Sequence, residues 1–290
     1  MCYFCKDFGF RKLKMIEITE KTIDIEAVLA SKVGDKMRYV PRFLVNWLIR
    51  IAHQDELNDF LWKNREKEGV AWLRSVLDHL DVKIEVEGLE NLPSPTDMRP
   101  STFVCNHPLG GIDGVALGAV VGETYGEHVR YFVNDLLMNF PALAPLCIPV
   151  NKTGKQSRGL ADKVADGFAS DNHIIMFPAG LCSRLIDGKI QDIPWGKAFI
   201  TKSIAAERDV VPVHFFGKNS NRFYRIAKVC KMLHLKVNIA MLFLSDEMFL
   251  NRGKTFRIVF GKPIPWQTFD KSKSPKKWAA WVREKVYEME

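Results

Sequence analysis

The stretch that decides the fold is residues 103–114, F-V-C-N-H-P-L-G-G-I-D-G. Residues 101–104 predict a short buried strand that leads into it. Gly110 and Gly111 then allow a sharp turn, because glycine tolerates backbone conformations that other residues avoid. The apolar residues 115–121 predict a helix after the turn. The stretch therefore predicts a strand, a tight turn and a helix in succession.

The same stretch carries His107 and, six positions later, Asp113. A strand that ends at a histidine, followed by a glycine turn and a carboxylate, can place imidazole and carboxylate side by side. Such a pair is the general-base half of a catalytic triad, in which the aspartate fixes the tautomer and the other ring nitrogen takes a proton. In a purely structural interpretation, Asp113 caps the helix and His107 is a polar loop residue. The stretch alone supports both interpretations equally.

The composition is that of a globular protein with one large domain, or one domain and an appendage. The chain has 290 residues, 47% of them hydrophobic and 26% charged. It has no run of 18 apolar residues, and residues 1–11 lack the pattern of a signal peptide. We therefore expect neither a transmembrane helix nor a secretory leader.

Cysteine usage and net charge limit which metals and partners can be expected. Of six scattered cysteines, only Cys2 and Cys5 form a C-x-x-C pair, which is weak evidence for zinc without a second pair. We expect reduced cytosolic thiols and no metal. The net charge of +8 favours an acidic partner, which could be anionic lipid, an acidic carrier protein or nucleic acid. Charge alone does not choose among them.

Residues 1–80 are predicted to be an N-terminal helical region, with helices at 23–33, 40–52, 55–67 and 70–80. Residues 1–14 lack a clear period and are interpreted as a loose extension. The helix at 40–52 places Phe43, Trp47, Leu48 and Ile51 near one face. Such a face can lie in a membrane interface, but it more often covers a core, and the core interpretation is favoured here.

Residues 81–290 are predicted to be one α/β domain, because strands and helices alternate. Strands are expected at 82–86, 101–104, 129–133, 147–150, 173–177, 210–216, 236–244 and 255–260. Helices are expected at 115–121, 159–169, 195–206 and 274–289. This alternation favours a mixed, largely parallel sheet flanked by helices on both faces.

Three further segments follow predicted strands or lie within one. They are residues 150–158 (V-N-K-T-G-K-Q-S-R), 174–184 (I-I-M-F-P-A-G-L-C-S-R) and 210–217 (V-V-P-V-H-F-F-G). Taken singly, each is ordinary, since basic residues after strands are usually solvated and F-P-x-G is an efficient turn. Pro212 is expected at a sheet edge or a bulge, because proline cannot donate to the ladder. Together they matter, since the strands near 101, 147, 173 and 210 can all end at one edge, where such folds bind ligands.

Four blocks in order resemble the glycerolipid (lysophospholipid) acyltransferase family, and in particular its hemolysin-like branch. They are N-H-P-L-G-G-I-D-G, F-P-A-G-L-C-S-R, V-V-P-V and R-I-V-F-G-K-P-I-P, within residues 82–265. That family has a His-x4-Asp motif, a polar basic block, an F-P-E-G block and a V-P-V block. This chain departs from it in two places: five residues separate His107 from Asp113, and Ala179 replaces the glutamate. The extra residue falls in the Gly-Gly turn.

The resemblance implies a mechanism. His107 would deprotonate an acceptor hydroxyl, which attacks an acyl thioester, while Asp113 orients the imidazole and N–H groups near Gly180 or a helix start hold the oxyanion. The thioester would be acyl carrier protein or coenzyme A, with no bound cofactor, and the absence of G-x-S-x-G argues against an ordinary lipase. Substrate-binding candidates are Asn106, Lys152, Arg158, Gly180, Ser183 and Arg184. The residues that shape the third and fourth blocks are Phe177, Pro178, Val211, Pro212 and Val213.

Two acceptor classes remain open under this resemblance. A lyso-glycerophospholipid such as 1-acylglycerol-3-phosphate is slightly favoured. The alternative is a lyso-amino-acid lipid, such as a lyso-ornithine or lyso-glycine lipid, which some members of the hemolysin-like branch acylate. The expected location is the cytoplasm, at the inner face of an anionic membrane. A catalytically silent membrane- or carrier-binding protein is a further alternative, and nucleic-acid binding, which rests on charge alone, is the weakest.

Overall fold

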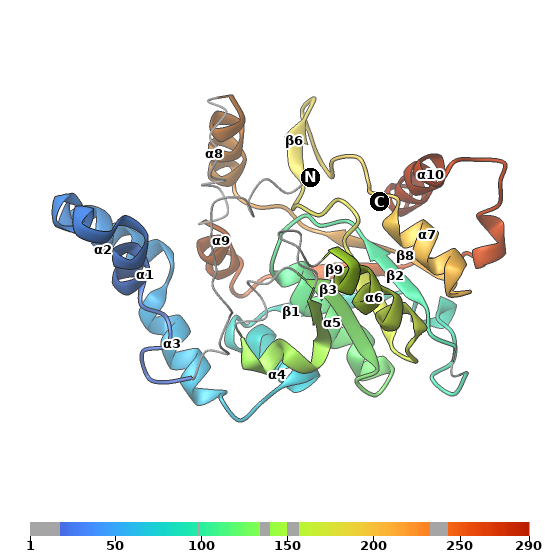
Figure 1. The fold of residues 1–290 in the computed structure, drawn as a ribbon, viewed down its shortest axis with the longest axis horizontal. Coiled ribbons are helices and arrows are strands. Elements are labelled where there is room, and N and C mark those ends of the chain that lie inside the picture. Colours follow the sequence, from blue (N-terminus) through green and yellow to red (C-terminus); the bar gives the residue numbers. More distant parts are fainter. Residues whose placement is uncertain (1–17, 98, 134–139, 150–156, 233–242, 290) are drawn as a thin grey trace.

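The computed structural model describes residues 18–97, 99–133, 140–149, 157–232 and 243–289 (Figure 1). The helices are α1 (Ile25–Val33), α2 (Arg42–Ile51), α3 (Gln54–Lys63), α4 (Gly69–His79), α5 (Ile112–Thr124), α6 (Ser157–Ala169), α7 (Ala198–Ala205), α8 (Asn221–Met232), α9 (Leu244–Leu250) and α10 (Pro275–Tyr287). The strands are β1 (Lys83–Glu87), β2 (Thr102–Cys105), β3 (Val129–Val133), β4 (Cys147–Pro149), β5 (His173–Met176), β6 (Arg184–Ile186), β7 (Lys189–Gln191), β8 (Val210–Phe216) and β9 (Thr255–Phe260).

In the described part of the chain, seven strands form one mixed, largely parallel sheet in the order β1-β9-β8-β2-β5-β3-β4. Strands β4, β3, β5, β2 and β8 run parallel, whereas β9 is antiparallel to β8, and β1 is parallel to β9. Val104 in β2 is in register with Met176 in β5 and with Pro212 in β8. The carboxyl ends of β2, β5 and β8 therefore meet at one edge, which confirms the predicted fold class.

Helices cover both faces of the sheet, because the central strands are apolar on both sides. Phe103 and Cys105 of β2 join the core under α4 and α5, whereas Val104 joins the core under α7 and α10. Gly118 in α5 allows a close approach, because a Cβ there would overlap the Tyr131 hydroxyl of β3. Helix α4, which the sequence groups with the N-terminal helices, shares the larger core with β2 and α5.

Pro212 lies in an interior strand, so the expected edge position is wrong, but the expected bulge is present. Val213 pairs with Phe260 and Val210 bridges to Ile264, so residues 261–263 stand opposite residues 211–212. The carbonyl of Pro212 accepts the Gly261 N–H at 2.9 Å, so this side of the Pro212 backbone faces the β9 side of the sheet. The missing N–H of the proline therefore faces the bulge, where the β9 ladder has already ended.

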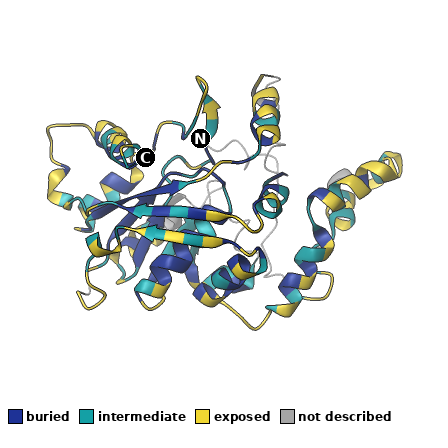
Figure 2. Cartoon of the chain, turned by 180° about the vertical axis from the view of Figure 1, so that it is seen from behind, coloured by how far each residue is buried: buried dark blue, intermediate teal, exposed yellow. Residues whose placement is uncertain are grey.

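Helix α2 covers a core only in part, because it buries Val45 and Ile51 but leaves other apolar residues exposed. Phe43 is 75% exposed and Trp47 is 42% exposed, whereas Ile51 is buried. Figures 1 and 2 show α1 and α2 projecting from the sheet, with mostly exposed residues along them. Within the described ranges, every helix is too short or too polar to traverse a bilayer.

The sequence did not predict the β6–β7 hairpin, α8 or α9. The strand expected at 236–244 lies mostly outside the described residues, and its last residue, Leu244, begins α9. The pair Cys2 and Cys5 also lies outside the described residues. Helix α9 contacts the glycine turn that follows β2, because Gly110 lies against Leu244 and Gly111 lies against Met248.

Candidate active site

His107 and Asp113 lie side by side at the carboxyl edge of the sheet. Strand β2 ends just before His107, and Asp113 is in the first turn of α5. The imidazole Nδ1 is 3.0 Å from Oδ2 of Asp113. The geometry that the sequence predicted for this pair is therefore present. The extra residue is accommodated in the turn, where Gly110 adopts the left-handed φ of +79° that favours glycine.

Asp113 is fully buried, and the turn provides its hydrogen bonds. Its Oδ2 accepts the N–H groups of Leu109 at 2.9 Å and Gly110 at 3.1 Å, and its Oδ1 accepts the N–H of Gly114 at 2.9 Å. Burial raises the pKa of Asp113, but the His107 charge and these hydrogen bonds outweigh burial, so the pKa lies below its ordinary value. Asp113 is therefore an ionised partner for the imidazole.

The His107 ring presents its second nitrogen away from Asp113. Its side chain is 18% exposed, and one face of the ring lies on Phe177 at a centroid distance of 4.2 Å. Burial lowers the pKa of His107, but the charge and hydrogen bond of Asp113 outweigh it and raise the pKa above the ordinary value. Among the described residues, Nε2 has no hydrogen-bond partner, so this nitrogen is the one available to take a proton.

Asn106, proposed from the sequence as a substrate-binding residue, holds two strands together instead. Its side chain is buried, and its Nδ2 donates to the Phe215 carbonyl at 2.9 Å. Its Oδ1 accepts the Phe215 N–H at 2.7 Å. Both ends of the amide are therefore engaged by β8, and the residue fixes the end of β2 just before His107.

The third block brings Ser183 and Arg184 next to His107 but gives Gly180 a structural role. The Gly180 N–H bonds to the Phe177 carbonyl at 2.9 Å, so it is not free to hold an oxyanion. Ser183 is buried, and its N–H donates to the His107 carbonyl at 2.7 Å. Arg184 is half-buried, and its Nη1 donates to the carbonyls of Cys182 and Ser183 at 2.7 and 3.2 Å. Arg184 directly follows Ser183, whose N–H bonds to the His107 carbonyl, and its positive charge acts to lower the pKa of His107.

The remaining sequence candidates divide into described and undescribed residues. Lys152 lies outside the described residues, and Arg158 is described only as part of the α6 backbone. Phe177 and Pro178 follow β5, and Pro212 is in the interior of the sheet. Val211 and Val213 are buried in the larger core. Ala179, which replaces the usual glutamate, packs half-buried against the core under α7 and α10.

Asp192 was missed by the sequence analysis, although it contacts the catalytic stretch. It lies between β7 and α7, is 1% exposed, and accepts the His107 N–H at 3.2 Å. The signal available was D-I-P-W at residues 192–195, immediately before a predicted helix. A carboxylate before a helix is commonly an N-cap, so the pattern alone does not reveal this contact.

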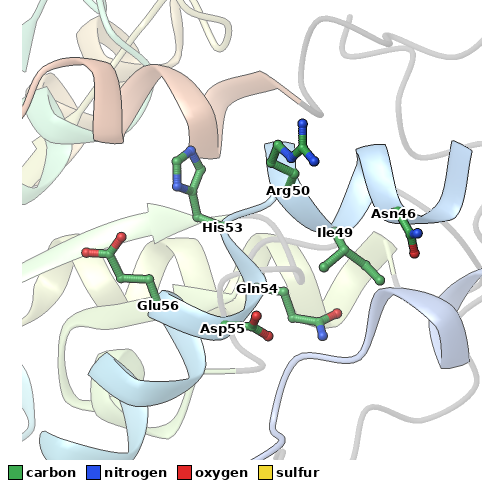
Figure 3. Close-up of a pocket in the computed structure, with 7 residues that line it drawn as sticks. All are labelled: Asn46, Ile49, Arg50, His53, Gln54, Asp55 and Glu56. Atoms are coloured by element: carbon green, nitrogen blue, oxygen red, sulfur yellow. The ribbon is translucent and has the colours of Figure 1, made fainter. Parts of the chain in front are cut away.

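Two open clefts in the described chain are lined by the N-terminal helices and not by the catalytic stretch. One, of about 500 Å³, is lined at the junction of α2 and α3 by Asn46, Ile49, Arg50, His53, Gln54, Asp55 and Glu56 (Figure 3). His53 points towards α9, where its Nε2 is 2.9 Å from Asp246, and its ring stacks on Phe249. Helix α9 thus lies between this cleft and the catalytic turn. The described residues contain no group of three or more histidine, cysteine or acidic side chains arranged to hold a metal ion.

A buried His–Asp pair with one free imidazole nitrogen, at the carboxyl edge of a parallel sheet, is an arrangement that can act as a general base. Comparison with known proteins gives the class of reaction. A family model described as acyltransferase matches residues 27–290, and the chain belongs to this acyltransferase family. The protein is therefore an acyltransferase, as the resemblance implied.

Two curated relatives match nearly the whole chain. A lyso-glycine lipid O-acyltransferase of Phocaeicola vulgatus is 57% identical over 276 residues, covering 95% of this chain and 98% of that protein. A lyso-glycine lipid O-acyltransferase of Bacteroides thetaiotaomicron is 56% identical over 267 residues, covering 92% of this chain and 97% of that protein. A solved structure, the 1-acyl-sn-glycerophosphate (LPA) acyltransferase PlsC from Thermotoga maritima, aligns with a TM-score of 0.46 and 16% identity, covering 91% of this chain and 93% of that chain.

Proposed function

We propose that this acyltransferase moves a fatty acyl group from a thioester to the hydroxyl of a lyso-glycine lipid. The observation that carries the chemistry is the His107–Asp113 pair with its free Nε2. The names of two relatives, at 57% and 56% identity, support the acceptor. The 1-acylglycerol-3-phosphate acceptor, which the sequence slightly favoured, has less support than this alternative.

The proposed reaction needs no covalent enzyme intermediate and no bound cofactor. Nε2 of His107 removes the proton from the acceptor hydroxyl as its oxygen attacks the thioester carbonyl. Asp113 stabilises the imidazolium that forms. The tetrahedral intermediate then collapses, the C–S bond breaks, and the imidazolium returns its proton to the leaving thiolate. The products are an ester and a free thiol, and His107 is neutral again.

The chemistry of the acceptor fits the groups around His107. Glycine has no hydroxyl, so the acylated hydroxyl must belong to the fatty chain of the acceptor. Phe177 provides an apolar wall beside the imidazole for such a chain. A glycine joined to that chain through its nitrogen keeps a free carboxylate, for which Arg184, next to the Ser183 that bonds the His107 main chain, is the candidate cation.

The acceptor is tested by comparing the two candidate lipids in separate reactions. Purified protein is given lyso-glycine lipid or 1-acylglycerol-3-phosphate, each with acyl carrier protein or coenzyme A thioesters, and products are identified by mass spectrometry. We expect diacylated glycine lipid as the main product, and the active thioester identifies the donor. Preferential acylation of the glycerophosphate would overturn the acceptor, and transfer to neither lipid would overturn the function.

We also propose that the enzyme works at an anionic membrane, peripheral to its cytoplasmic face. Helix α2 supports this proposal, because Phe43, Leu44 and Trp47 are exposed apolar residues that line an open groove of about 560 Å³. The net charge of +8 adds attraction to anionic lipid. Helix α9 connects this region to the catalytic turn, since it contacts His53 on one side and Gly111 on the other.

A further inference from the structure

The carboxylate of Asp192 is buried against the backbone of the catalytic histidine. Its Oδ1 accepts the Ser183 hydroxyl at 2.6 Å and the His107 N–H at 3.2 Å. Its Oδ2 accepts the indole N–H of Trp195 at 2.9 Å. All three contacts are donors, which suits an ionised carboxylate that can only accept.

Three residues form a closed ring of hydrogen bonds at this point. Asp192 holds the N–H of His107, and the N–H of Ser183 donates to the carbonyl of His107 at 2.7 Å. The Ser183 hydroxyl closes the ring on Asp192. The main chain of His107 is therefore fixed through both its N–H and its C=O groups, independently of the bond between its ring and Asp113. The next residue after Ser183 is Arg184, so the ring also fixes the spacing between the base and this cation.

The ring is anchored to the C-terminal helix. The N–H of Asp192 donates to the Tyr287 hydroxyl at 2.8 Å, and Nη2 of Arg283 donates to the Asp192 carbonyl at 2.8 Å. Arg283 also bonds the side chain of Gln191 at 2.9 Å. Helix α10 thereby holds the segment that holds His107, although α10 contributes no residue to the His–Asp pair.

The charge at position 192 acts on the base as well as the hydrogen bonds. The charged groups that act on the His107 imidazole are Asp113 from α5, Asp192 from the β7–α7 segment and Arg184 from β6. Both carboxylates favour the imidazolium, and Arg184 opposes it. Burial raises the pKa of Asp192, and the bonds from Ser183 and Trp195 oppose that rise. A buried carboxylate is costly to maintain, and a neutral acceptor would serve for hydrogen bonding alone.

We propose that Asp192 is a positioning residue for acyl transfer: it fixes the main chain of His107 and ties it to the Ser183–Arg184 segment, so that the base and the acceptor-binding cation keep one spacing. This inference rests on the proposed function and adds a second carboxylate, after Asp113, to the groups that act on His107. Asp192 acts through His107 and does not touch the reacting atoms.

The test compares Asp192→Asn, Ser183→Ala and a matched control, Asp209→Asn. Asp209 is a half-buried carboxylate at the start of β8, where it accepts the Trp266 N–H, at the opposite end of the strand from the site. For each variant, kcat and KM are measured against pH, and the imidazole of His107 is titrated by nuclear magnetic resonance. The His107 signal is identified by its loss in His107→Gln.

Asp192→Asn is expected to lower the pKa of His107, so the acidic limb of the kcat/KM profile moves to lower pH. Its kcat falls about 10-fold to 100-fold, because the base is misplaced. Ser183→Ala retains both carboxylates, so the limb stays in place while kcat falls. Asp209→Asn leaves both the acidic limb and kcat at their wild-type values. If Asp192 only stabilised the fold, Asp192→Asn would lower kcat without moving the acidic limb of the kcat/KM profile.

An unshifted imidazole titration and full kcat in folded Asp192→Asn would overturn the proposal. If Asp192→Asn fails to fold, as judged by circular dichroism, Ser183→Ala decides the question. Full kcat in Ser183→Ala would overturn the positioning role of the hydrogen-bonded ring. A reduced kcat, with the acidic limb of the kcat/KM profile unmoved, would support that role. The titration does not depend on turnover. A wild-type protein inactive towards lyso-lipids would refute the proposed function, and the Asp192→Asn titration would then still decide whether this carboxylate acts on His107.

Discussion

At the scale of single residues, the chemistry depends on the protonation of one imidazole. His107 can accept a proton only when it is neutral, and Asp113 raises its pKa above the ordinary imidazole value of 6.5 despite burial. Activity should therefore rise with pH through a value above 6.5, and be lost below it, because protonated His107 is no longer a base. The profile of kcat/KM against pH measures this limb. An acidic limb well below the ordinary value would contradict the assignment.

Substitution of the pair should remove most of the rate. His107→Ala is expected to lower kcat by about 10²–10⁴-fold, the usual contribution of a general base. Asp113→Asn should be nearly as damaging, because an amide supplies no counter-charge and would face the N–H of Gly114 with a second donor. Single-turnover rates of purified variants measure the effect, with circular dichroism as the control for folding. Near-native turnover by folded His107→Ala would exclude this mechanism.

Arg184 should control acceptor binding more than turnover. Nη1 of Arg184 is engaged by local carbonyls, which aims the guanidinium as a planar fork. Arg184→Lys should raise the KM for lyso-glycine lipid by about 10-fold, the loss of one charge-assisted bond, with kcat almost unchanged. Arg225→Lys, on the exposed side of α8, is the matched control. A KM that stays constant in Arg184→Lys would remove Arg184 from the acceptor site.

At the scale of elements, α2 should provide the membrane contact. Replacing Phe43 and Trp47 by serine should reduce flotation with vesicles of anionic lipid, because both side chains are exposed. Replacing Val229 and Met232, which are exposed apolar residues of α8, is the matched control. High salt should release part of the wild-type protein, since screening weakens only the electrostatic share. Wild-type protein that floats with neither anionic nor neutral vesicles would contradict the membrane proposal.

The elements also show how far sequence reasoning reaches. The strand, turn and helix around His107 were predictable, because an apolar strand, two glycines and an apolar helix leave few arrangements. The exposed face of α2 was not, since an amphipathic pattern does not tell whether its apolar side meets a core or another surface. The hydrogen-bonded ring around Asp192 could not be predicted from the sequence either, because its members come from distant segments and His107 contributes only its backbone. Periodicity carries no information about such contacts.

At the scale of the whole molecule, His173 should make stability depend on pH. It is buried at the start of β5, its Nδ1 accepts the Ser101 N–H at 3.1 Å, and burial together with the charge of Arg208 lowers its pKa to about 4. The unfolded chain, with an ordinary value of 6.5, binds this proton more readily. The free energy of unfolding should therefore fall as pH drops from 6.5 towards 4, by about 3 kcal/mol at most.

Urea unfolding at about pH 7.5 and about pH 5 measures this loss. His173→Gln is the control, because its amide oxygen can still accept the Ser101 N–H but does not titrate. The pH dependence should be smaller in the variant than in the wild type. The same dependence in both proteins would show that other groups cause it.

The pairing of β1 with β9 has a consequence for how the protein folds while it is being synthesised. Lys83 pairs with Thr255, so β1 stays without its neighbour until residues 255–260 have been synthesised. The His107–Asp113 turn is also synthesised long before Tyr287 and Arg283, which hold the Asp192 segment. Contacts between such distant segments make folding slow, because a long loop must close first. Residues 275–287 are therefore synthesised after the segments that carry His107, Asp113, Ser183 and Asp192, and their emergence from the ribosome completes this network.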